Sequence, residues 1–273
     1  MAKNIIQILD PDWLERFRLD LLSDKDSESI NWKFGQLLKH YQLLNYRFNF
    51  SEPIWRARIC SESSGYQNVK ELEAPPPSMI TKPGRINNCG ESVFYGSFNK
   101  HAVFEEIKAS EGCYVHIAGF KIKEEIRCGL VGEYYKVHRS GKSSISDEAG
   151  ALINRILSGI PHKKGIGFIL IDAILSEILA KKNASAEGYL YTRALGRQLL
   201  EKLPDIDGLV YPSVASSHAM NLALNVDAAR SKLELSGNSV LKIVKRYEYG
   251  IYDYELIRNA SGHYQDGTIN WEP

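Results

Sequence analysis

Cysteine is scarce in this chain, and the few cysteines that occur form no pattern typical of metal binding. The four residues, Cys60, Cys89, Cys113 and Cys128, include no C-x-x-C pair, and no histidine pair lies near them at zinc-finger spacing. A zinc site is therefore not expected. Four cysteines in 273 residues are also too few for a disulfide scaffold. We expect reduced thiols and a cytoplasmic protein.

An excess of charge of one sign is also missing. Lys and Arg number 34 and Asp and Glu number 33, which gives a formal net charge of +1. Proteins that bind nucleic acid through bulk charge usually carry a clear basic excess, so no nucleic-acid partner is expected. The seven histidines, among them His101, His116, His138, His162 and His218, form no H-E-x-x-H motif or evident triad, so no metal is expected.

Long apolar runs are absent as well. The most apolar stretch, residues 166–180, contains Asp172 and Glu177, and it is too short and too charged to span a bilayer. We predict a buried helix there. Residues 1–10 lack the long apolar core and the small-residue cleavage site of a signal peptide. No membrane partner is expected.

The composition is that of an ordinary globular protein, with 44% hydrophobic and 25% charged residues. Apolar residues recur at helical spacing over 13–22, after Asp10 as a candidate cap, and again over 30–44, with an interruption at 27–29. We therefore predict an N-terminal helical segment over residues 1–50, which we interpret as packing support rather than as a partner-binding unit. Residues 51–273 form the predicted main domain.

Within the main domain, strands and helices alternate irregularly, which favours an α+β fold over a doubly wound sheet. A polar loop of more than 20 residues, 61–84, contains Pro75, Pro76 and Pro77, which cannot pair in a central strand. The patterns predict strands at 54–59, 92–97, 113–120, 208–212 and 222–224, helices at 99–108, 148–158, 167–182 and 186–203, and a final hairpin of 240–249 and 252–257.

Four stretches carry side chains suited to chemistry. The first, residues 84–90, has glycines at both ends, which permit close backbone approach to a ligand, and it contains Arg85 and Asn87. It is neither a P-loop nor a G-x-G-x-x-G fingerprint, and taken alone it is as well explained by a surface arginine. In the second stretch, Tyr95 falls on a predicted strand, and Glu106 lies two to three turns into the next helix on an apolar stripe. Glu106 would be either partly buried, with a partner, or a carboxylate on the helix surface. Glu105 should lie on the exposed face.

The third stretch is the predicted strand of residues 54–59. Arg56 and Arg58 would point to one face of it, where they could bind a diphosphate. Taken alone, this pattern favours an exposed, charged edge strand. In the fourth stretch, Ser213 ends a buried strand and precedes Asn221. It could donate to a ligand, or it could be a turn serine after Pro212.

Taken in their order along the chain, the four stretches resemble the RES domain family, which is named for its arginine, glutamate and serine. The similarity extends over about residues 53–225, and the chain differs from compact members by its N-terminal segment and by an insertion near 125–185. The segments that carry the resemblance are Trp55-Arg56-Ala57-Arg58, Pro83-Gly84-Arg85-Ile86-Asn87-Asn88-Cys89-Gly90 followed by Phe94-Tyr95-Gly96, Ala102-Val103-Phe104-Glu105-Glu106-Ile107, and Asp207-Gly208-Leu209-Val210-Tyr211-Pro212-Ser213 with Asn221-Leu222-Ala223-Leu224.

The resemblance implies an ADP-ribosyltransferase-like fold, with a split β-sheet core flanked by helices, and an enzyme that consumes NAD as its substrate without a metal. Several members of the family are toxins of toxin–antitoxin pairs. By this resemblance, Glu106, Arg85 and Tyr95 are catalytic. The residues that bind NAD are Arg56, Arg85, Asn87, Tyr95, Ser213 and Asn221.

We therefore predict an enzyme that breaks the nicotinamide–ribose bond of NAD, as a glycohydrolase or a phosphorylase. The alternatives are a protein ADP-ribosyltransferase and a non-catalytic NAD-binding module. The implied partners are NAD and an inhibitor or antitoxin protein, and a homo-oligomer is left open. A carboxylate near the reacting carbon would stabilise the cationic ribosyl group, and Tyr95 could stack on the nicotinamide ring.

Overall fold

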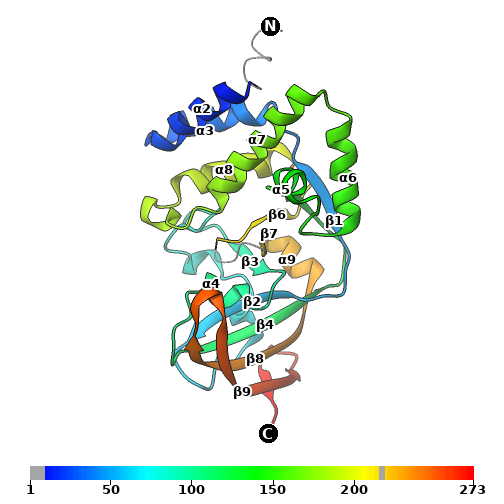
Figure 1. The fold of residues 1–273 in the computed structure, drawn as a ribbon. Coiled ribbons are helices and arrows are strands. Elements are labelled where there is room, and N and C mark those ends of the chain that lie inside the picture. The colour runs from blue at the N-terminus through cyan, green and yellow to red at the C-terminus, as the bar shows by residue number, and fades with distance from the viewer. Residues whose placement is uncertain (1–9, 215–218) are drawn as a thin grey trace. The chain divides into compact units, whose positions relative to one another are not determined.

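The computed structural model describes residues 10–214 and 219–273 and divides into two compact units (Figure 1). Unit 1 consists of Met1–Tyr46, Lys82–Asn88 and Cys128–Pro212, and unit 2 consists of Arg47–Thr81, Cys89–Arg127 and Ser213–Pro273. The sequence features assigned to residues 1–9 and to His218 lie outside the described residues. The division into residues 1–50 and 51–273 stays a prediction.

Helices and strands mix without a regular βαβ alternation, so the fold class is α+β, as predicted. No helix within the described ranges combines the length and the apolar character needed to cross a membrane. The helices are α2 (Pro11–Ser23), α3 (Ser27–Leu38), α4 (Ala102–Glu106), α5 (Glu133–Ser140), α6 (Asp147–Ser158), α7 (His162–Leu179), α8 (Leu190–Lys202) and α9 (Val226–Lys232). The strands are β1 (Leu44–Phe48), β2 (Ile54–Cys60), β3 (Val93–Ser97), β4 (Tyr114–Ile122), β5 (Ile126–Leu130), β6 (Gly208–Pro212), β7 (Met220–Asn225), β8 (Leu233–Arg246), β9 (Tyr252–His263) and β10 (Ile269–Trp271).

Unit 2 is built on an antiparallel sheet with the strand order β7-β3-β2-β4-β8-β9-β10. The predicted C-terminal hairpin is present as β8 and β9, and it is longer than the pattern indicated. Strand β2 pairs with β3 on one side and with β4 on the other. The interpretation of β2 as an exposed edge strand is therefore wrong, because long-range pairing, which a local pattern does not report, places it inside the sheet.

The core of unit 2 lies between α4 and one face of this sheet. Val103 and Phe104 of α4 pack against Ala57 of β2, Ile117 of β4 and Ile243 of β8. Phe104 is completely buried. This packing holds a helix of only five residues, which would not be stable by itself, at a fixed place on the sheet.

The long polar loop after β2 is held against the sheet by a buried histidine. The backbone N–H of Tyr66 donates to Nδ1 of His116 at 3.1 Å, and Nε2 of His116 lies 2.8 Å from Oδ1 of Asn238. Because Nδ1 accepts, the ring is neutral with its proton on Nε2, which donates to Asn238. Burial lowers the pKa of His116, which agrees with this state.

Unit 1 consists of helices around a short parallel pair, in which β5 is paired with β6. Asp10 caps α2 by accepting from the backbone N–H of Trp13 at 3.1 Å, as predicted. Residues 27–29 do not interrupt a helix but begin α3, because Asp26 accepts from the N–H of Ser29 and acts as its N-cap. Most of helix α7 is buried, as its sequence indicated, although residues 162–164 and Glu177 are exposed.

Candidate active site

Glu106 is held by two side chains from distant parts of the sequence, all within unit 2. The hydroxyl of Ser213 donates to Oε1 of Glu106 at 2.5 Å, and Nδ2 of Asn221 donates to the same oxygen at 2.7 Å. Ser213 and Asn221 are both buried, and Glu106 is half-buried. Three of the residues that the sequence assigned to one site are therefore in direct contact.

Each member of this cluster is placed by its own element. Glu106 is the last residue of α4, rather than two to three turns into a longer helix as predicted. Asn99 precedes the helix and accepts from the N–H groups of His101 and Ala102. Asn221 lies on β7, opposite Ser97 of β3 in the antiparallel register.

Glu105 is not the solvated carboxylate that the pattern suggested. It accepts from the guanidinium of Arg246 at 3.1 and 3.0 Å and from the hydroxyl of Tyr252, both on the C-terminal hairpin. Its side chain is only 15% exposed. The two consecutive carboxylates therefore fix α4 to two different parts of unit 2, and only Glu106 contacts the predicted site residues.

Arg56 and Arg58 project from β2 and are each bonded to a carbonyl group. Arg56 donates to the carbonyl of Tyr95 at 2.6 Å, and Arg58 donates to the carbonyl of Glu73 at 2.8 Å. Burial and the charge of Arg58 lower the pKa of Arg56 to about 9, and burial also lowers the pKa of Arg58. Both stay cationic at neutral pH.

These two cations have no counter-charge in contact. Among the described residues, neither Arg56 nor Arg58 forms an ion pair, and the buried Nε of Arg56 has no hydrogen-bond partner. The charge of Glu71 acts on Arg58 without an ion-pair contact and partly opposes the lowering of its pKa. Buried charges are ordinarily paired, so neighbouring guanidinium groups with no carboxylate in ion-pair contact are suited to an anionic ligand. Tyr95 is half-buried on β3, and its carbonyl links it to Arg56.

Arg85 and Asn87 belong to unit 1. A guanidinium nitrogen of Arg85 donates to the carbonyls of Leu179 and Lys181 at 2.6 and 3.2 Å, where α7 ends. Asn87 is buried, and its amide donates to the carbonyl of Asn88. The predicted roles of Arg85 and Asn87 toward NAD stay predictions.

We expect Arg85→Ala to destabilise the protein, because it leaves the carbonyls at the end of α7 without their donor. The expected loss in the free energy of unfolding is about 1–3 kcal/mol, measured by urea denaturation. Lys82→Ala is the matched control, since Lys82 is an exposed cation in the same segment. Equal stability of the two variants would contradict the structural role of Arg85.

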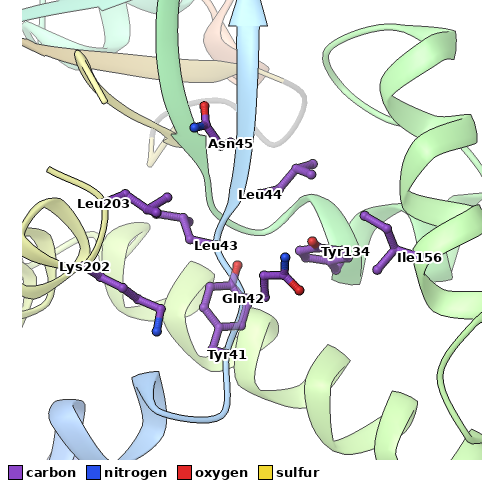
Figure 2. Close-up of a pocket in the computed structure, with 9 residues that line it drawn as sticks. All are labelled: Tyr41, Gln42, Leu43, Leu44, Asn45, Tyr134, Ile156, Lys202 and Leu203. Carbon is purple, nitrogen blue, oxygen red and sulfur yellow. The ribbon is translucent and has the colours of Figure 1, made fainter. Parts of the chain in front are cut away.

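A groove of about 530 Å³ in unit 1 contains none of the predicted site residues (Figure 2). In Figure 2 the amide of Asn45 and the ammonium of Lys202 point away from each other. Lys202 is already bonded to the carbonyl of Leu38 at 2.7 Å. We therefore place the candidate site at Glu106. The groove is lined by Tyr41, Gln42, Leu43, Leu44, Asn45, Tyr134, Ile156, Lys202 and Leu203.

Next to this groove lies a buried carboxylate to which the sequence assigned no role. Asp172 of α7 accepts from the hydroxyl of Tyr41 at 2.5 Å and from the N–H groups of Gly132 and Tyr135 at 2.8 and 2.9 Å. Burial raises the pKa of Asp172 to about 6, although these bonds act to lower it. Its position in the most apolar stretch of the chain was the available signal, because a charge there requires partners.

No group of three or more potential metal ligands occurs among the residues that the structure describes. None of the four cysteines forms a disulfide bond.

Comparison with known proteins agrees with the predicted resemblance. The model of the RES domain family matches residues 166–239. Over these residues the chain is similar to RES domains. The matched residues include Ser213 and Asn221, whereas Arg56, Arg85, Tyr95 and Glu106 precede them.

A structural comparison finds a chain of the M. tuberculosis MbcT–MbcA toxin–antitoxin complex, with a TM-score of 0.39 and 8% sequence identity. The alignment covers 77% of this chain and 91% of that chain. No curated protein matches the sequence.

Proposed function

We propose that this protein consumes NAD by breaking the bond between nicotinamide and ribose, with Glu106 as the catalytic carboxylate. The observation that carries the proposal is the contact of Glu106 with Ser213 and Asn221. A half-buried carboxylate held in one position by two buried donors is suited to stabilising a charge that develops beside it.

The proposed reaction begins with departure of nicotinamide, which takes both electrons of the bond to C1′ of the ribose. The remaining ribosyl group is cationic, and the carboxylate of Glu106 stabilises it. Water or phosphate then supplies the electron pair of the new bond to C1′. Hydrolysis gives ADP-ribose, nicotinamide and one proton, and phosphorolysis gives ADP-ribose 1″-phosphate and nicotinamide.

The diphosphate of NAD carries two negative charges, and Arg56 and Arg58 are the cations of unit 2 that support binding of such a group. Both are partly withdrawn from water, and neither has an ion-pair partner within the described residues. Tyr95 is proposed to stack on the nicotinamide ring. The resemblance to the RES family adds Arg85 and Asn87, and an inhibitor or antitoxin protein, to this proposal.

The proposal is tested by incubating the purified protein with NAD and following nicotinamide by chromatography. Mass spectrometry of the other product, with and without phosphate, separates hydrolysis from phosphorolysis. Transfer of label from adenylate-labelled NAD to protein would identify an ADP-ribosyltransferase instead. Saturable NAD binding without release of nicotinamide would indicate a binding module, and neither binding nor turnover would refute the proposal.

A further inference from the structure

Both hydrogen bonds to Glu106 fall on one oxygen of its carboxylate. The donors Ser213 and Asn221 share Oε1, at 2.5 and 2.7 Å. No donor within residues 10–214 and 219–273 reaches Oε2. Two donors from separate segments restrict rotation of the side chain, and they leave the second oxygen available to a ligand.

The orientation of the Asn221 amide follows from this contact. A carboxylate oxygen accepts and does not donate, so the NH₂ end of the amide must face Glu106. The carbonyl oxygen, Oδ1, is then directed elsewhere, and it is buried without a partner among the described residues. A buried acceptor without a donor is unfavourable for folding. The buried Oδ1 of Asn221 therefore lowers the stability of the fold, whereas the NH₂ group of the same side chain holds Glu106.

The position of Glu106 makes such support necessary. A side chain on the last residue of a five-residue helix is poorly restrained by the helix itself. The next residues also leave the helical path, because Lys108 has a positive φ of 53°. Carboxylates are in addition disfavoured near the C-terminal end of a helix. Without donors from β7 and from Ser213, nothing in α4 would fix the direction of the carboxylate.

We propose that Asn221, together with Ser213, is a positioning residue for catalysis, which acts on Glu106 rather than on the substrate. Its NH₂ group fixes Oε1 so that Oε2 faces the reacting carbon. This inference rests on the proposed function, and it replaces the direct contact with NAD that the family resemblance implies for these two residues.

The experiment compares kcat and KM for NAD in the wild type and in Asn221→Leu, a variant of similar volume without polar atoms. Loss of positioning should lower kcat by about ten- to a hundredfold, with KM changed less than about threefold, because uniform binding is retained. The thermal midpoint should stay equal or rise, because the unpartnered acceptor is removed. Ser239→Ala is the control within the same sheet: it removes a half-buried hydroxyl of β8 that donates to Oδ1 of Asn259 on β9, and its kcat should be unchanged.

Action through Glu106 is then tested in the Glu106→Gln background. There Asn221→Leu should lower kcat no further, because the charge that it positions is already gone. A multiplicative loss would overturn the inference, as would an increase in KM at constant kcat. If the wild type cleaves NAD and Asn221→Leu keeps the wild-type kcat, the positioning role of Asn221 fails while the proposed function stands. A wild type that releases no nicotinamide overturns both.

If Asn221→Leu does not fold, Asn221→Asp provides the second test. Two carboxylates this close do not both stay charged, so the pair shares a proton, and the protonated acid can replace the amide as donor. The activity of Asn221→Asp relative to wild type should therefore recover as the pH falls from 8 to about 5.5. A pH profile parallel to that of the wild type would overturn the inference.

Discussion

Glu106→Gln is expected to lose NAD cleavage by a hundredfold or more, an increase in the activation free energy on the order of 3–4 kcal/mol. The structure makes this substitution informative, because both hydrogen bonds fall on Oε1. Glutamine keeps an acceptor at that position and has nearly the same shape. The variant should therefore keep the geometry and remove only the negative charge. KM for NAD should change little, since the charge acts on the transition state.

The neighbouring carboxylate provides the control for this result. Glu105→Gln removes a charge one residue away, but Glu105 is bonded to Arg246 and Tyr252 instead of to the site. We expect lower stability and a kcat within a few fold of the wild type. Single-turnover nicotinamide release, measured for both variants, distinguishes them. Equal losses of kcat in Glu106→Gln and Glu105→Gln would contradict the assignment of Glu106 as the catalytic carboxylate.

Asp172→Ala is expected to lower the free energy of unfolding by about 3–5 kcal/mol, which is a large part of the stability of an ordinary domain. The substitution leaves two buried donors, the N–H of Gly132 and the hydroxyl of Tyr41, and the partly buried N–H of Tyr135 without an acceptor. The measurement is chemical denaturation followed by circular dichroism. Glu177→Ala is the control on the same helix, and this exposed partner of Arg18 should cost less than about 1 kcal/mol.

The same aspartate predicts a pH dependence with a definite sign. Burial raises the pKa of Asp172 to about 6, above the value of about 4 in an unfolded chain. The folded state then binds more protons than the unfolded state between these values, so the contribution of Asp172 to stability is lost as the pH rises through 6. The stability difference between wild type and Asp172→Ala should therefore be larger at pH 5 than at pH 7.5. A difference that grows with pH would contradict this assignment.

Most elements of the fold could be predicted because their signals are local. The cap at Asp10, the buried helix α7 and the C-terminal hairpin each follow from a few consecutive residues. The sequence patterns do not predict helix α5, which lies between Gly132 and Gly141, two glycines with positive φ values. Gly132 also needs to be glycine for space, because a Cβ atom there would lie 2.8 Å from Oγ of Ser176. The central position of β2 depends on its pairing with β3 and β4, which no local pattern contains.

In the candidate site, too, local signals could be predicted from the sequence, and contacts between distant residues could not. Periodicity placed Tyr95 on a strand and Glu106 on a helix, but it did not decide whether Glu106 was buried. Its contacts with Ser213 and Asn221 join residues 107 and 115 positions apart. The family resemblance, and not the pattern of the chain, brought these residues together in advance. The unassigned partners of Glu105 lie 141 and 147 residues away, which explains why it was expected to be solvated.

The attachment of α4 to the C-terminal hairpin has a consequence for how this protein can be shortened or fused. Arg246 and Tyr252, which hold Glu105, lie within the last 28 residues of the chain. A clone that stops before Arg246 would lack both of these anchors on the helix that bears Glu106, although every proposed catalytic residue would still be encoded. Expression designs should therefore keep the hairpin intact and attach affinity tags beyond it.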